Sequence, residues 1–100
     1  MDPAIPNIFV SDVVVSTAGR DQGSLYYVIS TDELFLMLVN GKDRTLDKPK
    51  RKKLRHVQKV LRSETRVAAK LASGDKVLNS ELRRDLAYIA REMQANNLGG

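Results

Sequence analysis

The residues best suited to chemistry in this chain form a dense run of cations at residues 48–57, KPKRKKLRHV. Residues 42–62 hold ten Lys or Arg and two Asp, a local net charge of +8, whereas the whole chain carries +5 and the remainder is therefore −3. Such side chains neutralise phosphates and release the counterions condensed on a nucleic acid. The run therefore predicts a surface that attracts a polyanion, most commonly nucleic acid.

A solvated edge strand protected by lysines is the simpler interpretation of this run. One or two lysines would serve that purpose, whereas six of the eight residues from Lys48 to Arg55 are cationic and repel one another. Binding of nucleic acid is therefore the favoured interpretation. Pro49 cannot donate a backbone hydrogen bond, so we expect it to present the charges at an edge or in a loop.

No group of residues in the sequence predicts a catalytic site. The chain has no cysteine and a single histidine, His56, so neither a thiol nucleophile nor a transition-metal site is expected. His56 is expected to contact RNA or to close the last strand. Four carboxylates lack metal-loop spacing and are expected in turns: Asp32, Glu33, Asp43 and Asp47. We predict no enzyme activity, no cofactor and no metal.

Two local features stand beside the basic run. The loop from Gly19 to Gly23 lacks the Gly-Lys-Ser/Thr ending of a phosphate-binding loop, so its glycines are expected to serve tight backbone geometry. A phosphate contact by Arg20 stays open. Tyr26 and Tyr27 are adjacent on a strand and point to opposite faces. One is expected to lie in the core, and the other to pack under a helix in preference to stacking on a base.

Five short strands are predicted to position these residues. They are expected at Phe9–Ser16, Leu25–Ser30, Leu34–Val39, about Arg44–Asp47, and Lys53–Gln58. Asn40-Gly41 is a strong signal for a two-residue hairpin with positive φ at both positions. Short strands joined by tight turns suit a small, strongly bent barrel.

Two helices are predicted to follow the strands. In Asn79–Gln94 the apolar residues recur at helical spacing, with Asn79 or Ser80 as N-cap. Ser63–Ala72 is a shorter candidate, closed by Gly74. We expect the apolar face of the longer helix to cap the barrel, with docking on a protein partner as the alternative.

Length and hydropathy indicate one small domain with an appendage. The chain has 100 residues, and no apolar stretch approaches the ~20 residues of a membrane span. The N-terminus has no basic region like that of a signal peptide, so a cytoplasmic protein is expected. We also expect a monomer. The expected division is a flexible lead-in at 1–8, a barrel at 9–60 and a helical extension at 61–97.

Residues 13–28, VVVSTAGRDQGSLYYV, resemble a KOW motif, which is an apolar strand, a loop with glycines four apart and a second apolar strand. With LVNGK at 38–42 and DKPKRKKLRHVQ at 47–58, roughly residues 11–60 resemble the KOW-domain RNA-binding proteins of Gram-positive bacteria. These are short relatives of a large-subunit ribosomal protein family of archaea and eukaryotes. The resemblance implies a five-stranded SH3-like barrel, RNA binding and no catalysis. The chain departs from the pattern at Asp12, Gln22 and Asn40.

The function predicted from the run and the resemblance together is RNA binding. The protein is expected to be ribosome-associated and to contact the phosphate backbone of structured RNA, ribosomal RNA first. A protein-interaction module of the translation or transcription machinery is the alternative, so ribosomal or transcription proteins are further expected partners, and membranes are not. The predicted RNA-binding residues are Arg20, Lys42, Arg44, Lys48, Lys50, Arg51, Lys52, Lys53, Arg55, His56 and Lys59.

Overall fold

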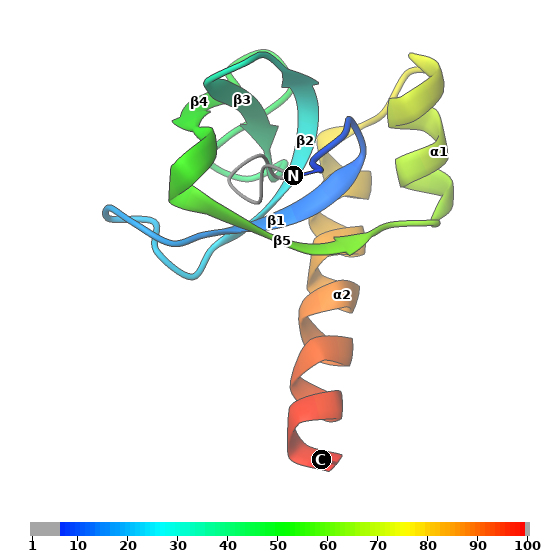
Figure 1. The fold of residues 1–100 in the computed structure, drawn as a ribbon. Helices are drawn as coiled ribbons and strands as arrows, with labels where there is room; N and C mark the ends of the chain where they lie inside the picture. The colour runs from blue at the N-terminus through cyan, green and yellow to red at the C-terminus, as the bar shows by residue number, and fades with distance from the viewer. Residues whose placement is uncertain (1–6, 100) are drawn as a thin grey trace.

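The computed structural model describes residues 7–99, and the side chains of residues 7–95. Five strands form one antiparallel sheet: β1 (Asp12–Ser16), β2 (Leu25–Thr31), β3 (Phe35–Val39), β4 (Lys50–Lys53) and β5 (Val57–Arg62). A 3₁₀ turn, η1 (Leu54–His56), separates β4 from β5, and the helices α1 (Arg66–Ser73) and α2 (Asn79–Gly99) follow. Figure 1 shows a strongly curved sheet, with the far end of α2 projecting beyond it.

The strands are ordered β4-β3-β2-β1-β5 in the sheet, so β4 and β5 form its two edges. Only η1 joins these edges, and a short connection requires the sheet to curve until its ends approach each other. Within the described residues β4 and β5 do not pair, so the sheet is bent but open. The predicted five strands and two helices are confirmed, whereas a closed barrel is not observed.

The prediction of a two-residue hairpin at Asn40-Gly41 followed by a strand at Arg44–Asp47 is wrong. Of the two turn residues only Gly41 has positive φ, at 76°, so the two-residue turn does not form. The Asn40 carboxamide oxygen instead accepts two hydrogen bonds from backbone N–H groups that follow it, which bends the segment into a loop. The loop ends at Pro49, and β4 uses the basic run itself.

Gly41 is required at its position because α2 begins beside it. A Cβ atom at Gly41 would lie 2.2 Å from the backbone oxygen of Asn79 and 2.9 Å from the Cβ atom of Leu82. The Asn79 side chain holds the same loop by accepting a hydrogen bond from the N–H of Leu46 at 3.1 Å. Asn79 and Ser80 are the first two residues of α2, so the predicted N-cap role of either is wrong. The carboxylate of Glu81 caps the helix by accepting from the N–H of Leu78 at 3.0 Å.

Other predicted boundaries also move. The first strand starts at Asp12 because the Asp12 carboxylate accepts a hydrogen bond from the N–H of Phe9, which makes residues 9–12 a turn. The fifth strand is displaced from 53–58 to 57–62 because β4 occupies residue 53 and η1 occupies residues 54–56. Helix α1 begins after Thr65, whose hydroxyl caps it, and ends at Gly74 as predicted.

Apolar side chains form a cluster on each face of the sheet. On one face, Val13, Tyr27 and Val39 pack against both helices, including Leu82, Leu86 and Ile89 of α2. On the other face, a second cluster brings together Ile8, Val14, Tyr26, Val28, Leu36 and Leu38. The apolar face of α2 is therefore used inside the molecule, as the preferred interpretation predicts.

Tyr26 and Tyr27 are both buried, on opposite faces of β2. The packing interpretation of this pair is confirmed, and neither ring is available to stack on a base. The Tyr27 hydroxyl contacts Ser63 and donates to the carboxylate of Asp85, which also accepts from the Thr65 hydroxyl at 2.9 Å. Burial and the hydrogen bond to Asp85 raise the pKa of Tyr27 to about 12. This buried polar cluster joins β2 to both helices.

Most of the predicted flexible lead-in at 1–8 lies outside the described residues. Its last residue, Ile8, is buried in the second core cluster. In the part of the chain that the structure describes, no helix combines the length and the apolar character that crossing a membrane requires.

Candidate nucleic-acid interface

Strand β4 divides the basic run between the two faces of the sheet. Successive strand residues point to opposite faces, so Lys50 and Lys52 share one side while Arg51 and Lys53 share the other. Lys52 is only 8% exposed, whereas Arg51 and Lys53 are exposed. In β3, the buried residue Leu38 is paired with Lys50 and the buried residue Leu36 with Lys52. The density of charge seen in the sequence is therefore halved on the outer face.

The inward pair is held by a single carboxylate, that of Asp21. Lys52 Nζ lies 2.7 Å from Asp21 Oδ1 and donates to the backbone oxygen of Ala18 at 2.7 Å. Lys50 Nζ lies 3.2 Å from Asp21 Oδ2. Burial acts to raise the pKa of Asp21, but hydrogen bonds, that from Lys52 the strongest, outweigh it and hold the pKa well below its usual range. Asp21 therefore remains an anion that pairs with two cations of the run, and its single charge offsets one of their two positive charges.

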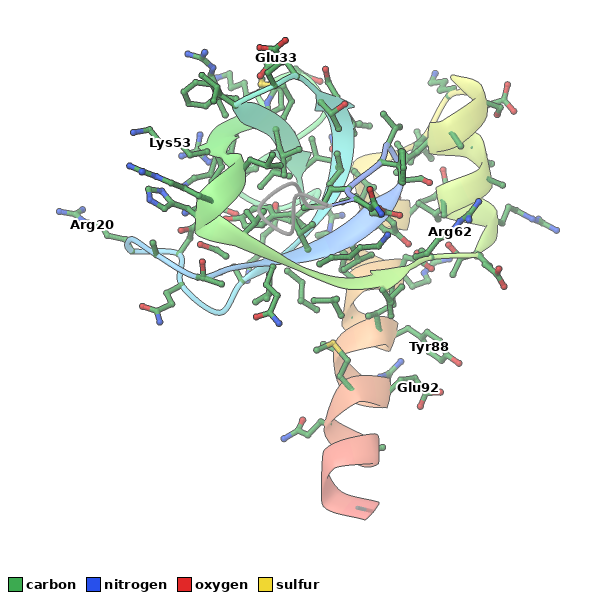
Figure 2. All side chains as sticks on the ribbon, in the orientation of Figure 1. Arg20, Glu33, Lys53, Arg62, Tyr88 and Glu92 are labelled. Atoms are coloured by element: carbon green, nitrogen blue, oxygen red, sulfur yellow. The ribbon has the colours of Figure 1, made fainter. Side chains whose placement is uncertain are left out.

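Asp21 also fixes the loop that carries Arg20. Its carboxylate accepts hydrogen bonds from the hydroxyls of Ser16, at 2.9 Å, and Tyr26, at 2.8 Å. The loop is thus tied to β1, β2 and β4 at once, while Arg20 is exposed at its tip (Figure 2). Gly19 and Gly23 both have positive φ, at 88° and 93°. This agrees with the prediction that these glycines serve the tight backbone geometry of the loop. Arg20 is consequently presented on a rigid support.

The outward pair meets solvent. The guanidinium carbon of Arg51 lies 3.7 Å from the centre of the Phe35 ring, so the two groups stack. A stacked guanidinium keeps its N–H donors at the rim of the plane, where they remain able to bind a phosphate. Lys53 is exposed beside it, and Arg55 follows in η1 and is also exposed. Figure 2 shows Lys53 and Arg20 on the same side of the molecule.

Four further predicted residues lie between β3 and β5 along the chain. Lys42, Arg44 and Lys48 lie in the loop between β3 and β4, with Lys42 and Lys48 exposed and Arg44 half-buried. His56 is half-buried at the end of η1, and its backbone oxygen accepts a hydrogen bond from the N–H of Thr17 at 2.9 Å. Five of the exposed cations are called the outer basic surface below: Arg20, Lys48, Arg51, Lys53 and Arg55.

Lys59 stands apart from the basic run. Its Nζ lies 3.0 Å from the buried carboxylate of Asp12 and donates to the backbone oxygen of Asn7 at 2.9 Å. Lys59 therefore resembles Lys52 in its contacts, because each amine neutralises a buried or nearly buried carboxylate. Lys50, Lys52 and Lys59 are the predicted site residues that the structure pairs with acids.

Sequence reasoning missed two residues that shape this site, Asp21 and Phe35. Asp21 lies 31 positions from Lys52, and no local pattern links the two. Phe35 could have been found only from the pairing of β3 with β4, which places it opposite Lys53 and diagonal to Arg51.

Comparison of the chain with protein-family models and with curated proteins finds no match. The resemblance to KOW-domain proteins therefore remains a prediction. The chemistry of the outer basic surface itself is what bears on function.

Proposed function

We propose that this protein binds structured RNA, with ribosomal RNA as the first candidate, by contacting the phosphate backbone through the outer basic surface. The observation that carries the proposal is the placement of these cations. They are exposed along β4, η1 and the adjoining loops, and none forms an ion pair with an acid among residues 7–95. Charge without acidic partners, on a chain that is otherwise mildly acidic, attracts a polyanion.

The proposal divides the predicted residues by role. Lys50, Lys52 and Lys59 already have acidic partners, so we assign them to the framework that shapes the surface. The outer basic surface makes the phosphate contacts, with Lys42, Arg44 and His56 at its margin. If four to six phosphates are neutralised, log K falls against log salt with a slope of roughly −3 to −5.

The proposal includes the fold family and the cellular role. Five antiparallel strands, a 3₁₀ turn between the last two and a strongly curved sheet support an SH3-like barrel of the KOW type. The protein then acts as a ribosome-associated, cytoplasmic RNA-binding protein without catalytic activity.

The alternative, a protein-interaction module, relied on the apolar face of the C-terminal helix. Leu82, Leu86 and Ile89 of that face are buried against the sheet. The face is therefore occupied within the molecule, and this observation favours RNA as the principal partner.

The test compares two variants of equal charge. Arg51→Gln/Lys53→Gln removes two cations from the outer basic surface, and Arg62→Gln/Lys76→Gln removes two exposed cations elsewhere, so both carry a net charge of +3 in place of +5. Figure 2 shows Arg62 on the opposite side of the molecule from Lys53. Binding to a labelled ribosomal RNA hairpin is followed by fluorescence anisotropy over a range of salt concentrations.

The first variant is expected to bind at least tenfold more weakly, with a salt slope smaller in magnitude by roughly 2, because each lost phosphate contact removes about 0.9. The control variant is expected to stay within about twofold of the original protein, since long-range charge alone is screened within ~10 Å at 0.1 M salt. Equal loss in both variants would show that net charge, and not this surface, governs binding. A DNA duplex of matched sequence tests the preference for RNA.

A further inference from the structure

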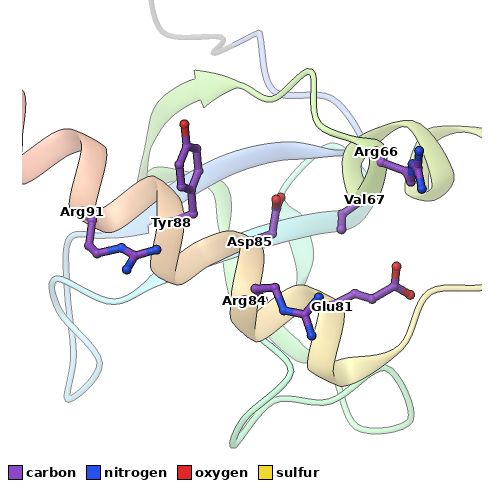
Figure 3. Close-up of a pocket in the computed structure, with 7 residues that line it drawn as sticks. All are labelled: Arg66, Val67, Glu81, Arg84, Asp85, Tyr88 and Arg91. Carbon is purple, nitrogen blue, oxygen red and sulfur yellow. The ribbon is translucent and has the colours of Figure 1, made fainter.

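A hollow lies between α1 and α2, away from the outer basic surface. It has a volume of about 480 Å³. Its lining includes Arg66 and Val67 of α1 and Arg84, Asp85, Tyr88 and Arg91 of α2 (Figure 3). We call it the interhelical groove. Figure 2 shows Tyr88 on the side of the molecule opposite Arg20 and Lys53, so a ligand here would not compete for β4.

The acidic residues of the interhelical groove are already engaged. Glu81 is 2.9 Å from Lys70 Nζ and also caps α2, which holds its pKa below the usual range. Asp85 accepts hydrogen bonds from the hydroxyls of Tyr27 and Thr65. Both carboxylates thus have other donors, and Glu81 in addition attracts Arg84 through space.

The three arginines of the groove, by contrast, are exposed and form no ion pair with the described residues. Arg84 and Arg91 are separated by two helical turns on the same face of α2, which puts their Cα atoms roughly 10 Å apart. Arg66 lines the groove from the start of α1, at the far end of the groove from Arg91 (Figure 3). A groove lined by three exposed guanidinium groups and two carboxylates is cationic overall and suits a ligand with phosphates.

Tyr88 gives the groove a stacking surface. Its side chain is 51% exposed and stands out from α2 with Arg91 on one side (Figure 3). A second hollow of about 310 Å³, lined by Ser63, Glu64 and Met93 among others, also borders Tyr88. The hydroxyl donates to Glu92 at 3.1 Å, which steadies the ring from its edge. A single exposed aromatic residue is common on protein surfaces, but this one separates two hollows and is flanked by arginines.

We propose that the interhelical groove binds a single-stranded segment of RNA, with a base stacked on Tyr88 and phosphates on Arg66, Arg84 and Arg91. Aromatic stacking beside a cationic track is the arrangement by which proteins hold single strands without reading their sequence. The proposal rests on the proposed function, to which it adds a second contact on the opposite side. The protein would then hold two segments of RNA together, one by shape and charge and one by stacking.

The experiment uses the protein's own tyrosine fluorescence. The chain has no Trp and three Tyr, of which Tyr26 and Tyr27 are buried at 1% and 0% exposure. A short unlabelled oligouridylate is therefore expected to quench mainly Tyr88. In parallel, anisotropy of a labelled eight-nucleotide oligouridylate measures affinity for Tyr88→Ala, for Tyr88→Phe and for Arg84→Gln/Arg91→Gln.

Tyr88→Ala is expected to weaken binding of the oligonucleotide about five- to a hundredfold, because stacking is lost. Tyr88→Phe keeps the ring, so it is expected to bind within about twofold while the quenching disappears. The double arginine variant is expected to reduce the magnitude of the salt slope by roughly 1.4, or about 0.7 for each single-strand phosphate contact. A thermal melt confirms that each variant is folded, which Tyr88 and both arginines allow because they are exposed.

The outcomes separate this proposal from the proposed function. If Arg51→Gln/Lys53→Gln weakens binding of the RNA hairpin while Tyr88→Ala leaves the oligonucleotide affinity unchanged, the groove is overturned and the outer basic surface stands. If the hairpin is not bound but the oligonucleotide is bound through Tyr88, the groove stands and the proposed function fails. Binding of a phosphorylated peptide by the groove arginines, with no binding of the oligonucleotide, would overturn the groove proposal in favour of a protein partner.

Discussion

Replacing Gly41 with alanine tests whether the loop after β3 is held in place by the start of α2. Gly41 has a φ of 76°, and an added Cβ would lie 2.2 Å from the backbone oxygen of Asn79 and 2.9 Å from the Cβ atom of Leu82. Neither neighbour is the end of a flexible side chain. Relief of the overlap therefore requires the backbone of the loop or of α2 to move.

The cost of Gly41→Ala has two parts. A left-handed backbone conformation costs a non-glycine residue about 1–2 kcal/mol. Displacing α2 to admit a methyl group costs about 1–3 kcal/mol more, as for other overpacked sites, because Leu82 is fully buried beneath the contact. The expected loss is thus about 2–5 kcal/mol, a large share of the ~5–15 kcal/mol typical of a domain of this size.

Gly74→Ala is the matched control. Gly74 has nearly the same φ, at 79°, but no atom lies within 4 Å of the position that its Cβ would take. It should lose only the conformational part, about 1–2 kcal/mol. Urea denaturation followed by far-UV circular dichroism gives the free energy of unfolding of each variant. Equal losses for Gly41→Ala and Gly74→Ala would refute the close approach of α2 to this loop.

Further predictions concern the buried carboxylates. Lys52→Gln is expected to lower the free energy of unfolding by about 1–3 kcal/mol because Asp21 loses a charged donor at 2.7 Å. The control Lys53→Gln, at an exposed position, should change the free energy of unfolding by less than about 0.5 kcal/mol. Equal melting temperatures of the two variants would contradict this prediction. The pKa of Asp21 is lowered in the folded protein, so its ion pairs contribute to stability above pH ~4 and this contribution is lost as the pH falls further. When the melting temperature is measured over a series of acidic pH values, it should therefore fall less steeply with pH for Asp21→Asn than for the original protein. Tyr27→Phe is expected to cost about 1–3 kcal/mol in urea denaturation because Asp85 loses a donor, and an unchanged midpoint would show that Thr65 alone suffices for that carboxylate.

Local patterns predicted the elements whose neighbours in sequence are also their neighbours in space. The β-branched and aromatic runs at 13–15 and 26–29 lie in strands, and the apolar spacing from Leu82 to Ile89 forms the buried face of α2. Gly74 ends α1 as its position predicts, because the left-handed residue that closes a helix is a local requirement.

The same patterns failed where a distant partner decided the outcome. Asn40-Gly41 is a strong hairpin signal, yet the loop it opens is held by Asn79 and Leu82 of α2, which lie far along the chain. The basic run was expected at an edge or in a loop between strands at 44–47 and 53–58, and it forms the edge strand β4 because β3 offers backbone groups with which to pair.

The sequence by itself therefore determined the number of strands, the two helices and the concentration of positive charge, since these follow from local backbone preference and from composition. Only the tertiary structure decided which cations remain available. The alternation of β4 turns Lys50 and Lys52 toward Asp21, 31 positions from Lys52, and leaves Arg51 and Lys53 to solvent. A charge is neutralised by what lies beside it in space, and that neighbour is set by sheet pairing and not by spacing along the chain.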